Sequence, residues 1–148
     1  MNFIRNRNFR AGPQTSLEGV ICPQNSDKQQ KIKVFGRSDG GVNIGKYCHI
    51  AKGLTIYSHN HNYRSDNFIP YDDEVVLKPV IIGDCVWIGC NVTIAPGTQI
   101  GKGCVVSSGS VVFGTIPDYS IIRGNPAVVI GSRNVETFDK LYNEGKFK

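Results

Sequence analysis

Long hydrophobic runs are missing from this 148-residue chain. No stretch approaches the roughly 20 apolar residues that a membrane-spanning helix needs. The first residues, MNFIRNRNFRAG, include three arginines but lack the apolar segment of a signal peptide. These absences predict a cytoplasmic protein, and the length suits a single domain with one hydrophobic core.

Paired cysteines and dense basic runs are missing as well. The five cysteines are odd in number and show no C-x-x-C spacing, which disfavours a disulfide framework and a cysteine zinc site. The formal net charge is +5, but no Lys/Arg run is interleaved with aromatic residues. We therefore expect reduced thiols, no nucleic-acid partner and a small anionic ligand.

A six-residue repeat dominates what is present. From Ile82 the chain reads IGDCVW IGCNVT IAPGTQ IGKGCV VSSGSV VFGTIP, and each unit opens on an aliphatic residue. An earlier block, IGKYCHIAKGLTIY, repeats the pattern from Ile44, Ile50 and Ile56. Six residues are too few for a helical repeat, so we expect short strands and tight turns, with three units in each coil of a solenoid.

Positions within the repeat have separate expected roles. The opening aliphatic residue should point inward, and the glycine beside it suits a turn that a bulky side chain would obstruct. The fifth position should face inward too, and it holds Cys48, Cys104 and, in the last unit, Ile116. A small apolar thiol packs well there, so we interpret these cysteines as structural.

The two repeat blocks are out of phase, because the 26 residues from Ile56 to Ile82 are not a multiple of six. Residues 58–79, SHNHNYRSDNFIPYDDEVVLKP, are polar and lack the repeat, which predicts a loop inserted into the coil. Long loops in compact domains tend to carry function. His59 and His61 lie at the root of this loop, whereas His49 precedes an inward residue and is interpreted as structural.

The C-terminal residues predict a helix that begins after Asn134 and stops at Gly145. Its apolar stripe consists of Val135, Phe138, Leu141 and Tyr142. We expect this helix to cover an end of the coil or a neighbouring chain. The single domain then divides into an N-terminal cap (1–41), coils (42–57 and 80–117), the inserted loop (58–79) and the C-terminal helix (132–148).

Three motifs together, VWIG at 86–89, SSGSVV at 107–112 and RGNPA at 123–127, closely resemble the hexapeptide-repeat acetyltransferases. The chain is similar to the maltose and galactoside acetyltransferases and to O-acetyltransferases of bacterial surface polysaccharide synthesis. The resemblance implies an all-β fold, the left-handed parallel β-helix. It also implies a homotrimer with acetyl-CoA in the groove between neighbouring coils.

The resemblance also implies a catalytic histidine five positions after a strand start, which is His61 here. A neutral histidine is well matched to remove the proton from an acceptor hydroxyl as that hydroxyl attacks the thioester of acetyl-CoA. The acetyl group then passes directly to the acceptor, and no acyl-enzyme forms. The resemblance further implies that the backbone N–H near Cys90 stabilises the oxyanion that forms when the hydroxyl attacks the acetyl carbonyl. Trp87 packs near the acetyl and pantetheine groups, and Ser108 lies beside the pantetheine amides.

Other predicted site residues are less directly tied to the family pattern. Phe113, Gly114 and Val128 replace residues that contact the CoA phosphates in relatives, so we assign that role to Arg123, Lys102 and Arg133. His59 is either a second catalytic residue or a solvated loop residue. For the acceptor, a sugar, nucleotide sugar or polysaccharide precursor, we expect hydrogen bonds from Asn60, Tyr63, Arg64 and Asp66.

Three alternatives to O-acetyl transfer remain open. One is N-acetylation of an amino sugar, and another is a β-helix scaffold without catalysis. The third is a metal enzyme similar to the γ-class carbonic anhydrases, since His59 and His61 should project to the same side of a strand. A carboxylate for that site would come from Asp66, Asp72, Asp73 or Glu74. Our leading prediction uses acetyl-CoA as co-substrate and no metal.

Overall fold

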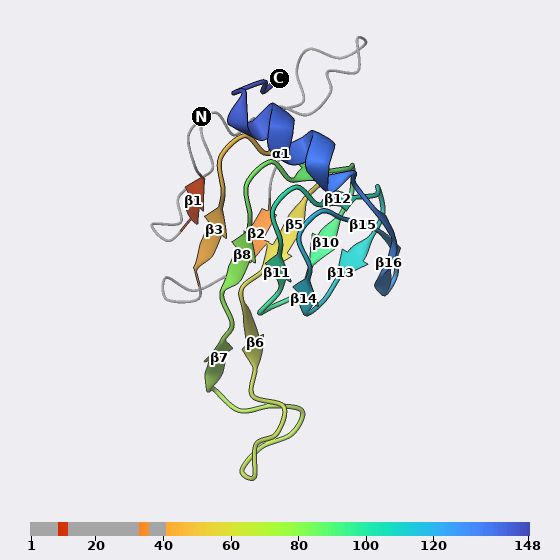
Figure 1. The fold of residues 1–148 in the computed structure, drawn as a ribbon. Coiled ribbons are helices and arrows are strands. Elements are labelled where there is room, and N and C mark those ends of the chain that lie inside the picture. The colour runs from red at the N-terminus through yellow and green to blue at the C-terminus, as the bar shows by residue number, and fades with distance from the viewer. Residues whose placement is uncertain (1–8, 12–32, 36–40) are drawn as a thin grey trace, which may run out of the picture.

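A coil of short parallel strands forms most of the computed structural model, which describes residues 9–11, 33–35 and 41–148 (Figure 1). The coils stack on one another, so that three sheets surround one core and each sheet takes one strand from each successive coil. This arrangement is typical of a left-handed β-helix. The predicted fold class, with its single C-terminal helix, is confirmed.

The three sheets are built as follows. Sheet A contains β1 (Phe9–Ala11), β3 (Val42–Ile44), β8 (Val80–Ile82), β11 (Gln99–Ile100) and β14 (Thr115–Ile116). Sheet B contains β4 (His49–Ile50), β9 (Trp87–Ile88), β12 (Val105–Val106), β15 (Ser120–Gly124) and the antiparallel β16 (Ala127–Ser132). Sheet C contains β2 (Lys33–Phe35), β5 (Thr55–Tyr57), β10 (Thr93–Ile94) and β13 (Val111–Val112). Strands β1 and β2 extend sheets A and C, and the rest of the predicted N-terminal cap lies outside the described residues.

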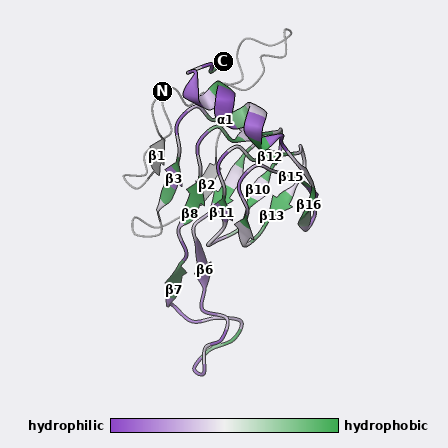
Figure 2. Cartoon of the chain, in the orientation of Figure 1, coloured by the Kyte–Doolittle hydropathy of each residue, from purple (hydrophilic) through white to green (hydrophobic). Residues whose placement is uncertain are grey.

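The core consists of the residues that open the repeat units, stacked in register. Ile82 pairs with Ile44 on one side and with Ile100 on the other, and all three are buried. Cys48 and Cys104 at the fifth position are also fully buried, as predicted. Figure 2 shows apolar residues concentrated on the strands of the coil, while the segment that leaves it is mostly hydrophilic. Burial of each aliphatic side chain stabilises the fold by roughly 1.5–3 kcal/mol.

Glycine beside the opening residue is required by the spacing between coils. A Cβ atom built on Gly83 would lie 2.7 Å from the backbone nitrogen of Lys102 in the next coil. On Gly89 it would lie 2.6 Å from the Ser108 hydroxyl oxygen. The expectation that a side chain would obstruct this turn is therefore correct.

The last repeat unit departs from the predicted register. We expected Ile116 at a fifth position, but it ends strand β14 and pairs with Ile100, so it takes the position of a residue that opens a repeat unit. Only four positions separate it from Val112, so this turn is two residues shorter than the others. Gly114 adopts a φ of 71°, a left-handed conformation that glycine enters at no steric cost, at the shortened turn.

Helix α1 (Val135–Asn143) lies along the coil, across stacked turns, and does not cover an end of the coil, which was one of the two positions that we expected (Figure 1). The Phe138 ring packs at 5.2 Å from the Tyr119 ring, and the Tyr142 hydroxyl donates to Asp84 at 3.1 Å. Asn134 caps the helix by accepting from the Thr137 N–H at 2.8 Å. Of the predicted apolar stripe, Phe138 and Tyr142 face the coil, whereas Val135 and Leu141 are exposed.

Residues 59–77 form a hairpin that projects from the coil (Figure 1). Its stem consists of β6 (His59–His61) and β7 (Val75–Leu77), which pair in antiparallel fashion. The sequence predicted a loop inserted at this point, and the structure adds a regular two-stranded stem to it. Both histidines of interest therefore lie on a strand that the stem holds in place.

Candidate active site

His61 lies on β6, opposite Val75, and its imidazole ring is exposed. The ring stacks on Tyr71, with ring centroids 4.0 Å apart and planes inclined by 18°. The His59 ring approaches it edge to face at 6.3 Å, so the two imidazoles do project to the same side of the strand. The sequence did not single out Tyr71, because its contact with His61 crosses the hairpin.

A hydrogen-bond network closes the neck of the hairpin beside this stack. The side-chain amide of Asn62 donates to Asp72 at 2.9 Å and to Glu74 at 3.3 Å. The Glu74 N–H donates to the Asp72 carboxylate at 2.9 Å. A hydrogen bond from the Ser65 hydroxyl, together with these donors, lowers the pKa of Asp72 below its ordinary value of 3.8. The carboxylate of Asp72 is thereby engaged in holding the hairpin together.

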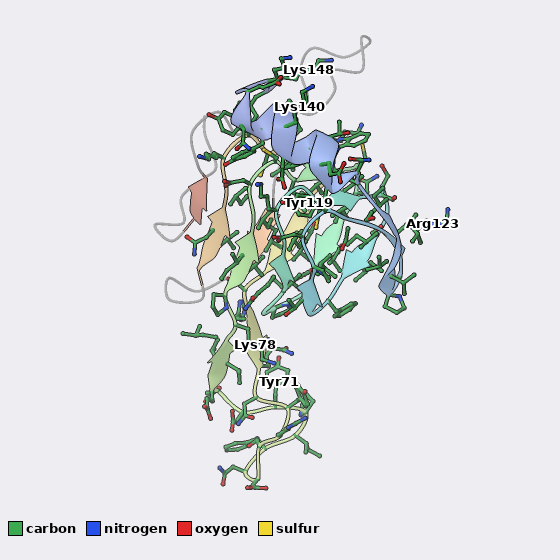
Figure 3. All side chains as sticks on the ribbon, viewed as in Figure 1. Tyr71, Lys78, Tyr119, Arg123, Lys140 and Lys148 are labelled. Atoms are coloured by element: carbon green, nitrogen blue, oxygen red, sulfur yellow. The ribbon has the colours of Figure 1, made fainter. Side chains whose placement is uncertain are left out.

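The predicted acceptor-binding residues all lie on the hairpin. Tyr63, Arg64, Asp66 and Asn60 are exposed, and the Arg64 guanidinium lies 5.7 Å from the centre of the Tyr63 ring. Asn60 uses its side-chain oxygen to accept the backbone N–H of His61 at 2.9 Å. Figure 3 shows Tyr71 and Lys78 on the same projecting segment. Acceptor binding by these residues stays a prediction.

Cys90 and Ser108 meet on adjacent turns of the coil. The Cys90 N–H, which we predicted as the oxyanion donor, donates to the Ser108 hydroxyl oxygen at 3.0 Å. Because that bond uses a lone pair of the serine oxygen, the hydroxyl hydrogen of Ser108 remains available to a substrate. Trp87 lies on β9 in the same coil as Cys90, and its side chain points outward with 56% of it exposed.

Two of the three residues predicted to bind the CoA phosphates contact helix α1. The Lys102 ammonium lies 3.4 Å from the Asp139 carboxylate and 4.0 Å from the centre of the Tyr142 ring. The Arg133 guanidinium lies 5.7 Å from the centre of the Phe138 ring of the helix, and its Nε donates to the Gly103 carbonyl at 2.7 Å. Arg123 instead lies exposed at the end of β15 (Figure 3). The structure therefore does not gather these three cations into one cluster.

Of the described cysteines, Cys48 and Cys104 are buried in the core, and Cys85 and Cys90 are half-buried in turns. Burial raises the pKa of the Cys104 and Cys85 thiols. Cys104 donates from its sulfur to the Pro117 carbonyl at 3.1 Å. A raised pKa keeps a thiol protonated and weakens it as a nucleophile.

The described residues show neither a cluster of metal ligands nor a membrane-spanning helix. Within these ranges no three His, Cys, Asp or Glu side chains gather as a metal-ligand set. None of the helices found there is long and apolar enough to cross a membrane. His49 hydrogen-bonds through Nε2 to the Lys148 backbone oxygen at 2.8 Å, which fits its interpretation as a structural residue.

Stacked coils of six-residue units, with a histidine-bearing hairpin between two of them, define a hexapeptide-repeat β-helix protein. The family model for the bacterial transferase hexapeptide (six repeats) matches residues 79–114. These residues include strands β8 to β13 and the VWIG and SSGSVV motifs. The resemblance predicted from the motifs is confirmed: the coil carries this repeat, and homologues of the chain are hexapeptide-repeat acetyltransferases.

Particular relatives extend this result. The chain is 42% identical over 103 residues to the protein named "Putative lipopolysaccharide biosynthesis O-acetyl transferase WbbJ" of Escherichia coli strain K12, covering 65% of this chain and 53% of that protein. It is 29% identical over 147 residues to a chloramphenicol acetyltransferase of Escherichia coli, covering 88% and 70%. A hexapeptide-repeat acetyltransferase of Vibrio cholerae, solved with acetyl coenzyme A, superimposes with a TM-score of 0.64 at 26% identity, covering 85% and 61%.

The matched region is shorter than most of these relatives. The chain spans about half the length of the first curated relatives that it matches, including 53% of WbbJ and 59% of the "Probable macrolide acetyltransferase" of Lysinibacillus sphaericus.

Proposed function

We propose that this protein is an acetyl-CoA-dependent O-acetyltransferase that acts on a sugar or surface-polysaccharide precursor in the cytoplasm. The observation that carries the proposal is His61, which stands five positions after the buried Ile56 of β5 on a hairpin beside the coil. Relatives named for lipopolysaccharide and colanic acid biosynthesis support the choice of acceptor class. The Vibrio cholerae structure with acetyl coenzyme A supports the choice of donor.

His61 acts as the general base in the proposed reaction. Its free ring nitrogen removes the proton of an acceptor hydroxyl while the hydroxyl oxygen attacks the acetyl carbonyl carbon. The carbon–sulfur bond then breaks, and the imidazolium returns its proton to the departing thiolate. The products are an acetyl ester and free CoA, and no covalent enzyme intermediate forms.

Cys90 and Ser108 supply the donors for the oxyanion. The Cys90 N–H and the Ser108 hydroxyl lie within one hydrogen bond of each other, at 3.0 Å. A carbonyl oxygen that approaches this turn can accept from the hydroxyl directly, and from the N–H once the serine rotates away. Oriented donors of this kind stabilise developing negative charge more strongly than water does.

The proposed site needs two chains. Among the described residues, the His61 ring contacts Tyr71 and His59. The hairpin leaves the coil between sheets C and A, whereas Cys90 and Ser108 lie at the corner between sheets B and C. A homotrimer would bring the hairpin of one chain against the coil of its neighbour. Exposed apolar side chains on the coil, including Ile81, Trp87 and Phe113, suit such an interface.

A panel of acceptors tests the proposal. Maltose, UDP-N-acetylglucosamine, an amino sugar and chloramphenicol are each incubated with acetyl-CoA, and free thiol is measured. We expect thiol release with a sugar, and a product whose acetyl group is removed by hydroxylamine, as expected of an ester. A hydroxylamine-resistant product would mean N-acetylation, and no release above background with any acceptor would contradict the proposal.

A further inference from the structure

Tyr71 lies across the hairpin from His61 and covers one face of its imidazole. The ring centroids are 4.0 Å apart and the planes are inclined by only 18°, which is a face-to-face contact. Tyr71 belongs to the connection between β6 and β7, ten positions along the chain from His61. The contact therefore depends on how the connecting segment folds back over the stem.

The stack leaves both ring nitrogens of His61 open. In the described part of the chain, the hydrogen bonds of this residue involve its backbone: its N–H donates to the Asn60 side chain at 2.9 Å, and its carbonyl accepts from the Tyr63 N–H at 3.0 Å. A general base is usually oriented by a hydrogen bond to its second nitrogen from a third group. Here the flat faces of Tyr71 and the edge of His59 are what restrict the ring.

The neck of the hairpin fixes Tyr71 over His61. Asp72, the next residue, accepts from the Asn62 side chain at 2.9 Å, and its N–H donates to the Asn62 carbonyl at 3.4 Å. The Asn62 N–H in turn donates to the Glu74 carbonyl at 3.2 Å. These bonds tie the residue after Tyr71 to the residue after His61, so the two rings are held at one separation.

From this geometry we propose that Tyr71 is a positioning residue for His61. Its aromatic face restricts the imidazole to one orientation without occupying a nitrogen, so that the ring meets the acceptor hydroxyl in a productive pose. The inference rests on the proposed function, in which His61 is the base. A base displaced by about 1 Å loses up to about a hundredfold in rate, so loss of the stack should lower kcat.

The phenol hydroxyl has no part in this role. Tyr71 is 45% exposed, and its ring stacks on the His61 ring. Phenylalanine offers the same face, whereas leucine offers similar bulk without it. Tyr71→Phe and Tyr71→Leu therefore separate stacking from simple filling of space. Phe68→Leu is the matched control, because Phe68 is another exposed aromatic residue of the same connection.

The first measurement observes the stack directly. A proton above an aromatic face is shifted upfield, so in histidine-labelled protein the His61 ring protons should shift downfield in Tyr71→Leu. They should keep their wild-type positions in Tyr71→Phe and in Phe68→Leu. Absence of any difference between wild type and Tyr71→Leu would overturn the inference, because the rings would not be stacked in solution.

The second measurement is the steady-state rate of thiol release from acetyl-CoA with the best acceptor of the panel above. We expect Tyr71→Leu to lower kcat about tenfold or more, with KM for acetyl-CoA changed less than about twofold. Tyr71→Phe and Phe68→Leu should both keep the kcat of the wild type. An unchanged kcat in Tyr71→Leu, in protein that has lost the NMR signature, would overturn the positioning role.

His61→Ala in the same assay separates this inference from the proposed function. If His61→Ala loses activity while Tyr71→Leu keeps it, the base stands and the positioning role is wrong. If His61→Ala retains activity, the proposed mechanism fails, whatever the NMR shifts show.

Discussion

Buried hydroxyl groups in the coil follow one bonding rule, with a single exception at the root of the hairpin. Ser110 donates to the carbonyl three residues earlier, that of Ser107, at 2.6 Å, and Thr98 and Ser120 do the same within their turns. This bond explains why a polar residue is accepted at an inward fifth position. Ser58 is 1% exposed, yet among the described residues its hydroxyl oxygen has no partner.

Ser58→Ala should therefore stabilise the protein. Burial of an unpaired hydroxyl costs about 1–3 kcal/mol, and alanine removes that cost while leaving the backbone unchanged. Thermal or urea unfolding should show a higher midpoint for this variant. Ser110→Ala is the matched control and should lower the midpoint, because it leaves the Gly124 N–H without the acceptor that it has at 3.2 Å. Equal effects of the two substitutions would contradict this account.

Single-residue predictions succeeded where the repeat defined the environment. The inward Cys48 and the glycine at Gly83 follow from position in a six-residue unit, because each coil repeats the geometry of the one before it. That His61 lies at the root of the inserted segment could be read from the sequence, while its catalytic role stays a prediction. The Tyr71 ring beside it could not be predicted, because that contact arises from the folding of a segment without periodicity.

Helix α1 connects the turns of successive coils at one corner of the β-helix. Its inward ring, Phe138, lies against Gly103 and Tyr119, and Tyr142 reaches Asp84 in an earlier coil. Lys102 completes the contact through Asp139 and through the Tyr142 ring. The helix thereby holds turns of several coils together through one face.

Phe138→Ala should destabilise the protein by roughly 1–3 kcal/mol, because it removes a half-buried aromatic ring from this contact. Leu141→Ala, at an exposed position of the same helix, should change stability by less than about 0.5 kcal/mol. Urea unfolding of both variants at one protein concentration provides the comparison. Similar losses for the two would mean that the apolar stripe packs as the sequence suggested, with Leu141 buried.

At the scale of elements, the sequence predicted the strands, the inserted segment and the C-terminal helix. The prediction failed where the six-residue repeat is interrupted, because the turn before Ile116 is two residues shorter than in the other units. It also left the position of the helix open, because an amphipathic stripe specifies that one face packs, without specifying against which surface. Only the tertiary arrangement shows that this surface is a row of turns.

The whole molecule leaves large apolar side chains exposed on the coil. Trp87 and Phe113 are more than half exposed, as are Val128 and Val129 on the outermost strand of sheet B, β16. Exposed apolar groups of this size are typical of an interface. The hairpin leaves the coil at a different corner from the turn of Cys90 and Ser108, so the shared site that we propose needs a second chain as well.

We therefore predict that the protein is a homotrimer at micromolar concentration. Sedimentation equilibrium should give three times the mass of one chain, and Trp87→Asp should shift the population toward smaller species by introducing a charge at the interface. A stable wild-type monomer would contradict both the assembly and a site shared between two chains.

The central claim is that His61 removes the proton in acetyl transfer, and the rate of thiol release by exhaustively chelated protein tests it most directly. We predict that the chelated wild type is fully active, that His61→Ala loses about 100- to 10,000-fold while still binding CoA, and that His59→Ala loses far less. A larger loss in His59→Ala would make His59 the base. Activity that chelation abolishes and zinc restores would contradict the mechanism altogether.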